Sequence, residues 1–343
     1  MEVDVVTMAD VARRAGVSVT TVSHVVNGTR HVAPATISLV NKVMAETGYR
    51  PNLAARALAT SSTTTIGLAL SIATNPYFGE LTRSLEDRLR HAGFSLVLAN
   101  TNDDATQALD VIDDLQSRQV SGLIVVPIDG NPAFAEMLHR LAEAQFPIAL
   151  LDRPSALPID QVYSGGHEAI FELTQHLARL GHQRIAYVHG TDESSSGRDR
   201  FEGFRAAVQA YHLDDSPRLV LEGRSDEHIA QTTVQHHLSA PDPCSAMVVS
   251  NNQMAIGALR AIRDLGLRVP QDVALVAFDD FEGADLLGPG ITVAKQNVDA
   301  LATGVVRAIL QRVKRADRQP STVVVPTTFV HRGSCGCAPP RVS

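Results

Sequence analysis

The sequence has little cysteine and no long run of apolar residues. Three cysteines in 343 residues cannot form a disulfide framework, and they fit a chain that works in a reducing compartment. The uncharged window 57–79 is rich in Ser, Thr, Asn and Pro, and its apolar stretch "IGLALSIA" is too short to span a bilayer. Glu2 and Asp4 stand where a secretory leader would be basic. We therefore expect a cytoplasmic protein with no membrane partner.

The sequence also lacks the local motifs of common enzyme classes. It contains no G-x-G-x-x-G after an expected strand, no P-loop, no G-x-S-x-G elbow and no H-E-x-x-H helix. His331, Cys335 and Cys337 could be half of a metal site. Because zinc requires four ligands, we expect free thiols in a mobile tail instead. The sequence thus predicts no enzyme, no cofactor and no metal site.

The charge is distributed unevenly along the chain. Residues 1–60 hold six basic and four acidic residues, whereas the remainder holds 24 basic and 33 acidic ones, which gives the net charge of −7. With 44% hydrophobic residues, the chain is long enough for two or three domains. A slightly basic end on an acidic body suggests that a polyanion would meet only the first sixty residues.

Residues 16–28, "GVSVTTVSHVVNG", are rich in β-branched residues, which favour extended chain. Their spacing favours a helix instead, because Val22, Val25 and Val26 form an apolar stripe at i, i+3 and i+4. Ser18 is placed to cap this helix, and Gly16 to end the one before it.

The preceding segment "TMADVARRA" predicts the partner helix. Thr7 can cap it, and Met8, Val11, Ala12 and Ala15 share one face.

A third helix at about 34–46 would close the small core with Ile37, Val40 and Met44. Two short helices joined by a tight turn make a helix-turn-helix, whose face of small hydrogen-bonding side chains can enter a major groove. The alternative is a plain helical hairpin with solvated Thr and His side chains.

From Thr65 onward, short β-branched runs alternate with helical segments such as 80–91 and 253–265. Continuous apolar runs separated by helices indicate parallel strands that are covered on both faces, in a doubly wound α/β architecture. The series restarts near Val162, so we expect two similar lobes with a cleft at the carboxyl ends of the strands. The runs are "TIGLALSI", "FSLVLANT", "GLIVVPI", "PIALLD", "RIAYVHG", "RLVLEG", "AMVVSN" and "VALVAFDD".

The segment "TMADVARRAGVSVTTVSHVVNGTRHVAPATISLVNKVMAETGYRPNLAARALA" resembles the DNA-binding head and hinge of the lactose-repressor/galactose-repressor family of bacterial transcription regulators. The resemblance continues in family order through "NPYFGEL", "LGHQRIAYVHG", "GRDRFEGF", "NNQMAIGALRAIRDLGLRVPQDVALVAFDD" and the late "RGS". It implies a helix-turn-helix head (1–50), a hinge helix with linker (51–61) and a two-lobed core of periplasmic-binding-protein type (62–343). The lobes would be about 62–160 with 296–322, and about 162–292 with 323–334. It also implies a homodimer on operator double-stranded DNA. Because the chain ends in "RGSCGCAPPRVS" without leucine heptads, we expect no tetramer.

The resemblance assigns DNA contacts by position. Val19, Thr20 and His24 match base-reading positions, and Leu58 matches a leucine that wedges into the minor groove from a hinge helix capped by Asn52. Leu58 could instead be a core leucine of the linker, and two of the phosphate-contact residues, Thr21 and Ser23, could simply face solvent. The remaining positions are phosphate contacts at Thr7, Ser18, Thr21, Ser23, Asn27, Thr29 and Arg30, and the basic hinge residue Arg56.

Polar residues just beyond the expected strands predict an effector site. By resemblance, Arg200 anchors the ligand, Asp279 is the aspartate that pairs with Arg200, and Asn251 binds a hydroxyl of the ligand. Arg200 could equally anchor the helix of "GRDRFEGF". Ser194 and Ser225 stand where purine-responsive members carry Arg and Phe, and Asn251 is followed by Asn252 where the family usually has Asp. The predicted site comprises Ser71, Tyr77, Phe78, Asp152, Ser196, Arg200, Asn251, Asp279 and Gln296.

These residues favour a repressor that a sugar or sugar-derived metabolite releases from its operator. Two alternatives stay open: a corepressor-type regulator that responds to a nucleoside or another small polar metabolite, and a small-molecule-binding protein without regulatory DNA binding. An intact helix-turn-helix argues against the second. A hydrolase on the two-lobed fold would need a nucleophile–base motif, which the sequence lacks.

Overall fold

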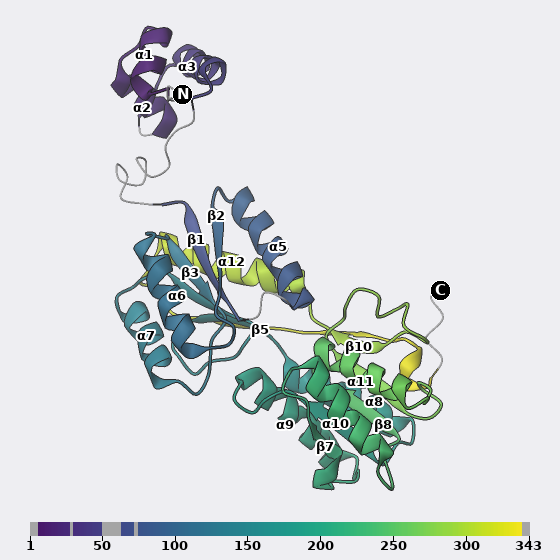
Figure 1. Ribbon diagram of the computed structural model, residues 1–343. Helices are drawn as coiled ribbons and strands as arrows, with labels where there is room; N and C mark the ends of the chain where they lie inside the picture. Colours follow the sequence, from purple (N-terminus) through teal and green to yellow (C-terminus); the bar gives the residue numbers. More distant parts are fainter. Residues whose placement is uncertain (1–5, 28–29, 50–62, 72–74, 338–343) are drawn as a thin grey trace. The chain divides into compact units, whose positions relative to one another are not determined.

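The computed structural model describes residues 6–27, 30–49, 63–71 and 75–337. Its contacts divide the chain into two compact units, and the boundary between them along the sequence falls between Thr63 and Thr64 (Figure 1). The expected hinge helix and linker at 51–61 lie outside the described residues. Within the described part of the chain, each helix is either too short or too polar to cross a membrane.

The first unit is a three-helix head made of α1 (Met8–Ala15), α2 (Val19–Asn27) and α3 (Pro34–Thr47). A capping box between Thr7 and Asp10 begins α1, and Gly16 ends it in the left-handed conformation at φ 63°. The β-branched stretch is therefore a helix, as the spacing of its valines predicts.

The core of the head explains why α2 is stable. Val22 is fully buried and Val25 and Val26 pack beside it, so tertiary packing outweighs the low helix propensity of valine. The expectation for Ile37 is wrong, because this side chain is 38% exposed, and Val43 fills the core together with Val40.

The second unit contains two six-stranded sheets, each covered by helices on both faces as in the doubly wound architecture. The first sheet has the order β11-β5-β4-β3-β1-β2 and the second β12-β10-β9-β8-β6-β7. The strands of the first sheet are β1 (Thr65–Leu70), β2 (Ser95–Asn100), β3 (Gly122–Val125), β4 (Ile148–Leu151), β5 (Asp160–Ser164) and β11 (Thr322–Val325). Those of the second are β6 (Ile185–His189), β7 (Val220–Glu222), β8 (Ala246–Val249), β9 (Ala274–Phe278), β10 (Thr292–Lys295) and β12 (Thr328–Val330).

Within the described residues of this unit, eight α-helices cover the sheets. Those of the first lobe are α5 (Pro76–His91), α6 (Ala105–Ser117), α7 (Pro132–Glu143) and α12 (Val298–Lys314). Those of the second lobe are α8 (Gly166–Arg179), α9 (Ser195–Ala210), α10 (Glu227–Ser239) and α11 (Asn252–Asp264), with short 3₁₀ turns η1 (Pro217–Leu219) and η2 (Gly333–Cys335).

All eight strands expected from apolar runs are present, and four further strands complete the sheets. β5 pairs in parallel with β4 and β11, so the first lobe includes residues 160–164 and 322–325 and extends a few residues beyond the expected limits of 160 and 322. Strand pairing is parallel except between β10 and β12, which are antiparallel.

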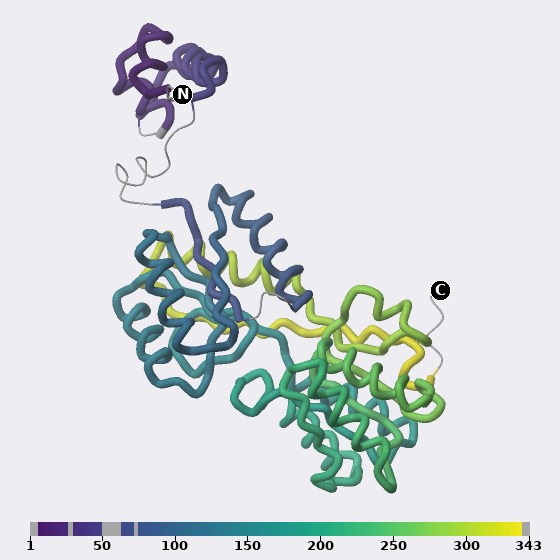
Figure 2. The backbone as a smooth tube through the Cα atoms, viewed as in Figure 1, coloured from purple at the N-terminus to yellow at the C-terminus, as the bar shows by residue number. Residues whose placement is uncertain are grey.

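The chain crosses between the lobes three times. It leaves the first sheet after β5 to enter α8, returns between β10 and α12, and crosses again between β11 and β12. Figure 2 shows the last of these crossings as the yellow segment that runs from one lobe to the other. Neither lobe is therefore a continuous piece of sequence.

A buried carboxylate fastens the returning segment to the first lobe. Asp160, at the start of β5, is fully buried and accepts hydrogen bonds from Arg312 of α12 at 2.7 and 3.0 Å. It also accepts from Arg318 and from the backbone and hydroxyl of Ser321, just before β11. These bonds hold β5, α12 and β11 together.

The C-terminal segment is ordered further than the sequence suggests. Cys335 is fully buried in η2 and Cys337 is half-buried, so the expectation that these thiols belong to a mobile tail is wrong for both. Cys335 belongs to the hydrophobic core of the second lobe, and η2, which carries it, lies against β9 and β10.

Candidate functional site

The head presents part of α2 to solvent. Val19 is 48% exposed and Thr20 is exposed, while Ser23 and His24 are half-buried. This surface offers methyl groups, hydroxyls and an imidazole, which are the groups expected to meet base edges and phosphates.

Several residues predicted to contact phosphates also cap helices. The Ser18 hydroxyl accepts from the Thr21 backbone at 3.0 Å and lies 2.8 Å from the Thr21 hydroxyl, and the Thr7 hydroxyl donates to Asp10 at 2.6 Å. Arg30 is exposed. The side chain of Asn27, together with Thr29, Asn52, Arg56 and Leu58, lies outside the described residues.

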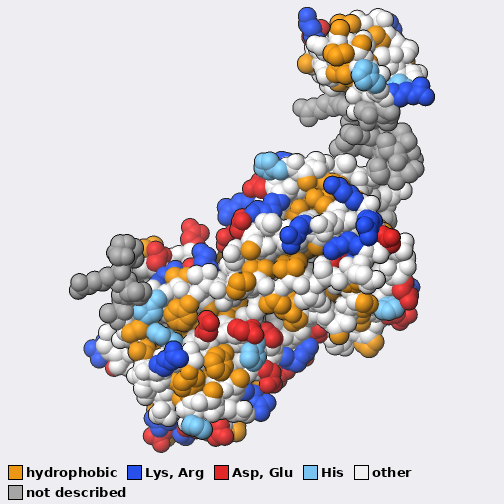
Figure 3. All heavy atoms as spheres, turned by 180° about the vertical axis from the view of Figure 1, so that it is seen from behind, with side chains coloured by type: hydrophobic (Ala, Val, Ile, Leu, Met, Phe, Trp, Pro, Cys, Tyr) orange, Lys and Arg blue, Asp and Glu red, His pale blue; other side chains and the backbone are white. Residues whose placement is uncertain are grey.

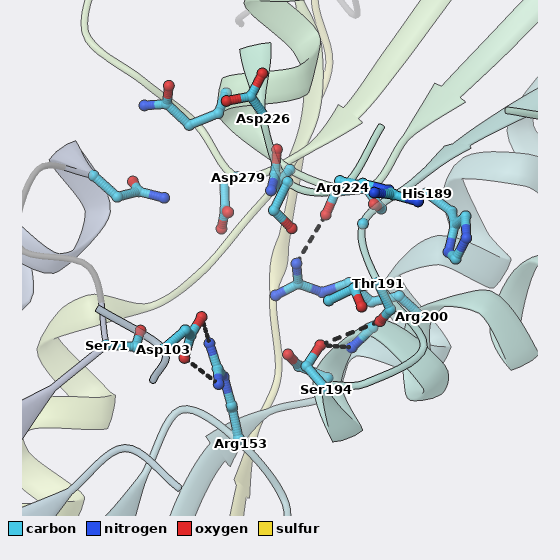
Figure 4. Close-up of a pocket in the computed structure, with 18 of the residues that line it drawn as sticks. Ser71, Asp103, Arg153, His189, Thr191, Ser194, Arg200, Arg224, Asp226 and Asp279 are labelled. Carbon is cyan, nitrogen blue, oxygen red and sulfur yellow. Dashed lines mark hydrogen bonds and ion pairs between the residues drawn. The ribbon is translucent and has the colours of Figure 1, made fainter. Parts of the chain in front are cut away.

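A cavity of about 820 Å³ lies between the two lobes. Parallel strands of both sheets end at this cavity, which is where polar residues that follow a strand converge. Figure 4 shows Arg200 and Asp279 facing Ser71 and the Asp103–Arg153 pair across it. All nine predicted effector-site residues line it: Ser71, Tyr77, Phe78, Asp152, Ser196, Arg200, Asn251, Asp279 and Gln296.

Asp152 and Asp279 occupy equivalent places in the two lobes. Each directly follows a buried strand and adopts the left-handed backbone conformation, at φ 75° and 71° respectively. The Tyr77 hydroxyl donates to Asp152 Oδ1 at 2.7 Å, and Gln296 Nε2 donates to Asp279 Oδ1 at 2.7 Å. The second oxygen of each carboxylate is thus available as an acceptor in the cavity.

Burial sets the ionisation of both carboxyl groups. Burial raises the pKa of Asp152, although the neighbouring Arg153 guanidinium opposes the shift. Burial also raises the pKa of Asp279 to about 6, against the opposing effects of Arg200 and the hydrogen bond from Gln296. A ligand that donates hydrogen bonds to these carboxylates would stabilise their ionised forms.

Arg200 is held in place without a carboxylate at ion-pair distance, so the expected pairing of Asp279 with Arg200 is not formed in this structure. Its guanidinium carbon lies 3.7 Å from the centre of the Phe278 ring, and Nη1 donates to the carbonyl oxygen of Ser250 at 2.8 Å. Its Nε is buried and has no hydrogen-bond partner, and the same is true of Gln296 Oε1 and Ser71 Oγ. Such groups favour a bound molecule that supplies hydrogen bonds.

Asn251 lines the cavity and also caps a helix. Its Oδ1 accepts from the Met254 backbone at 2.9 Å and caps α11, which directs its amide nitrogen to other partners. The next residue, Asn252, donates to Asn75 Oδ1 of the first lobe at 3.1 Å. A second contact between the lobes joins the Ser195 backbone N–H to the carboxylate of Asp129.

Sequence reasoning missed an ion pair in the wall of the cavity. Arg153 is buried and donates to both oxygens of Asp103 at 2.7 Å, and also to the Pro127 carbonyl at 3.2 Å. Asp103 and Arg153 come shortly after β2 and β4, so the strand-end rule applied to every strand would have found them.

The cavity carries more negative than positive groups. Eight carboxyl groups line it against three guanidinium groups, those of Arg153, Arg200 and Arg224. The surplus of carboxylates repels anions and suits a neutral or cationic ligand.

The comparisons with known proteins cover both units. Residues 7–52 match the family described as "Bacterial regulatory proteins, lacI family", and residues 174–335 match the "Periplasmic binding protein-like domain". The chain is 31% identical to the HTH-type transcriptional repressor PurR of Haemophilus influenzae (strain PittEE), over 91% of this chain and 92% of that protein. It is 32% identical to the ribose operon repressor of Escherichia coli (strain K12), over 96% and 99%.

Solved structures are similar over the same extent. A lac repressor dimer bound to operator and the anti-inducer ONPF superposes with a TM-score of 0.86 at 30% identity, covering 96% of this chain and 99% of that one. The complex of the transcriptional regulator CelR with cellobiose gives a TM-score of 0.71 at 28% identity, with the same coverage.

Proposed function

Since the chain belongs to the lacI family of bacterial regulatory proteins, and so is a DNA-binding transcriptional repressor and not an enzyme, we propose that a neutral sugar or sugar-derived metabolite is its effector. The effector binds in the cavity between the lobes and releases the protein from its operator. The observation that carries the proposal is the pair of buried carboxylates, Asp152 and Asp279, beside Arg200 in an acidic cavity.

The chemistry of the wall matches hydroxyl groups. A sugar hydroxyl can donate to a carboxylate and accept from a guanidinium at once, through charge-assisted hydrogen bonds. The Tyr77 and Phe78 rings supply apolar surface for one face of a sugar ring. The acidic lining disfavours phosphorylated sugars and nucleotides, and the volume accommodates one or two sugar rings. The names of the ribose operon repressor and of the CelR–cellobiose complex fit the same class of ligand.

The position of the cavity gives the effector control over the lobes. Asp152 belongs to the first lobe and Asp279 to the second, so a ligand held by both fixes the angle between the lobes. The first lobe begins at β1, only a few residues beyond the predicted hinge. Rotation of this lobe therefore changes the spacing of the two hinges in a dimer. Release is the proposed direction, because sugar-responsive catabolic members of the family mostly leave DNA on binding effector.

A homodimer on a near-palindromic operator completes the proposal. Val19, Thr20 and His24 would enter adjacent major grooves, and Leu58 of each hinge would enter the minor groove between them.

The two-lobed unit offers exposed apolar surface for a second copy. β2 is an edge strand of the first sheet, and Leu98 in it is 41% exposed, while Leu286 of the second lobe is 82% exposed. Figure 3 shows hydrophobic side chains exposed in groups on one face of the two-lobed unit. Apolar surface at an unpaired edge favours contact with a second copy.

A thermal-shift screen of the full chain tests the effector class. The panel contains neutral mono- and disaccharides, sugar phosphates, purine bases and nucleosides, and a ligand at about 100 times its Kd stabilises the fold by about 2.7 kcal/mol. Asp279→Ala should abolish the response to the active sugar. Asp113→Ala, at an exposed carboxylate of α6, is the control and should respond like the parent.

The same screen distinguishes the sugar effector from a second candidate, a purine or nucleoside corepressor. A nucleoside or purine corepressor is supported by the 31% identity to PurR. If purine compounds stabilise the protein and strengthen its binding to duplexes selected from random DNA, while sugars do neither, the sugar proposal is wrong and the corepressor reading replaces it.

A further inference from the structure

Four side chains with metal-binding atoms meet at the C-terminal end of the second lobe. His176 comes from α8, and His331, Cys335 and Cys337 come from the segment that follows β12. One ligand atom from each residue lies within 4.8 Å of all the others. The sequence offers three of these residues as a local group, and the fold adds the fourth from far away in the chain.

The distances between these atoms resemble those of a tetrahedral site. Zn–S bonds of about 2.3 Å and Zn–N bonds of about 2.0–2.1 Å place neighbouring ligand atoms roughly 3.3–3.8 Å apart. The Cys335 and Cys337 sulfurs are 3.2 Å apart, Cys335 Sγ lies 3.6 Å from His331 Nε2, and Cys337 Sγ lies 3.4 Å from His176 Nε2. The His331 Nε2 to Cys337 Sγ distance of 2.7 Å would open by roughly 1 Å around an ion.

Neighbouring groups orient the four side chains. Thr292 Oγ1 donates to Cys335 Sγ at 3.4 Å, and the ring of Phe329 packs edge-on against His176 and stacks on His331. His331 Nδ1 is buried without a hydrogen-bond partner, so Nε2 is the ring nitrogen aimed at the cluster. Two imidazoles and two thiols held in this way are a donor set for borderline-soft divalent cations.

We propose that His176, His331, Cys335 and Cys337 form a four-coordinate Zn²⁺ site that fastens the C-terminal segment to α8. All four positions are filled by protein groups, as in structural zinc sites, which leave no open position for a reacting molecule. The site lies in the second lobe and contains no residue of the effector cavity. It is therefore independent of the identity of the effector.

Metal binding to the untagged full chain tests the proposal. The reduced protein, stripped with a chelator, should take up one Zn²⁺ per chain in competition with a chromophoric chelator. Co²⁺ in its place should give sulfur-to-cobalt charge-transfer absorption and intense visible bands of tetrahedral cobalt. Zn²⁺ should also raise the Tm of the stripped protein. A parent protein that takes up no Zn²⁺ and shows no such cobalt spectrum overturns the proposal without any variant.

Variants then locate the ion. Cys335→Ser, Cys337→Ser and His176→Gln should each weaken Zn²⁺ binding by about tenfold or more and reduce the charge-transfer bands. Cys244→Ser and His228→Gln are matched controls that should bind like the parent. If the controls lose the ion and the cluster variants keep it, the cluster is not the site. Effector and operator binding, measured on the same proteins, report on the proposed function separately.

Discussion

Asp279 combines burial with a ligand-facing position. The residue is 5% exposed and follows β9, its carboxylate accepts a hydrogen bond from Gln296, and burial raises its pKa to about 6 from its ordinary value of 3.8. In the free protein this residue is ionised at neutral pH at a cost in folding free energy. A ligand that donates a hydrogen bond to it recovers part of that cost.

The raised pKa predicts a pH dependence of stability. A carboxyl group with a higher pKa in the folded state stabilises the fold fully below about pH 4, and this contribution is lost as the pH rises through about 6. Asp279→Asn removes it. The difference in unfolding free energy between parent and variant should therefore change by about 1–3 kcal/mol between pH 4 and 7, in urea titrations of the ligand-free protein.

The same titrations contain the control. Asp113→Asn removes an exposed carboxylate of α6 and should leave the pH profile of the parent unchanged. An Asp279→Asn profile that runs parallel to the parent over this range would show that Asp279 titrates normally.

The exposed face of α2 predicts which residues set the DNA sequence preference. Thr20→Ala and His24→Ala should each cost about 1–3 kcal/mol of discrimination at one position of the half-site. Selection from random duplexes followed by titration of single-base variants measures this. Ser38→Ala, on the exposed side of α3, should bind every sequence as the parent does. A selected site without two-fold symmetry would contradict the dimeric reading.

The residues of the effector cavity could be predicted because their signal is local. Each of Ser71, Asp152 and Asp279 follows an apolar run, and the ends of parallel strands meet at one edge of a sheet. His176 has no such signal. It lies 161 residues before Cys337, whose sulfur is 3.4 Å from its Nε2, and only the packing of α8 beside the C-terminal segment brings them together.

At the scale of helices and strands, glycine allows α10 and α11 of the second lobe to approach each other closely. A Cβ atom added at Gly257 of α11 would lie 2.1 Å from the Glu227 carbonyl oxygen at the start of α10. Gly79, on the exposed side of α5, has no atom within 4 Å of the same position. The two glycines therefore serve different purposes in the fold.

This contrast predicts opposite effects of the same substitution. Gly257→Ala must push two backbones apart and should destabilise the protein by about 1–3 kcal/mol or more. Gly79→Ala fills open space, removes a helix-interior glycine and should stabilise it by about 0.5–1 kcal/mol. Chemical denaturation measures the unfolding free energy of both variants. If the two substitutions change it in the same direction, the packing argument is wrong.

The spacing of apolar residues identifies helices and buried strands better than it identifies edge strands and the crossings of the chain between the lobes. The valines of α2 repeat at helical spacing, so the helix could be predicted against its propensity. β5, β11 and β12 gave no such signal because they are short and largely polar or partly exposed. Their pairing also depends on distance, since β11 joins β5 across more than 150 residues.

On the scale of the whole molecule, effector and operator bind the same protein, so their binding free energies are linked. If the effector weakens operator binding by some factor, operator must weaken effector binding by the same factor, typically about 5- to 150-fold or 1–3 kcal/mol. Calorimetry of the effector with and without operator, and operator titration with and without effector, should give equal factors. Asp279→Ala should lose both effects together. A variant that loses effector binding yet still responds to effector on DNA would refute the coupling.

The threefold crossing between the lobes has a consequence for biosynthesis. The head closes its core with residues between Val6 and Tyr49, whereas the core of the first lobe needs α12 and β11, and that of the second needs β10 and Cys335. A growing chain can therefore fold its head early but cannot finish either lobe until most of its length has been translated. A nonsense mutation between about residues 64 and 298 would release a polypeptide whose one finished core is the head. Such a fragment would keep the surface of α2 but lack the effector cavity, so premature termination would separate DNA contact from metabolic control.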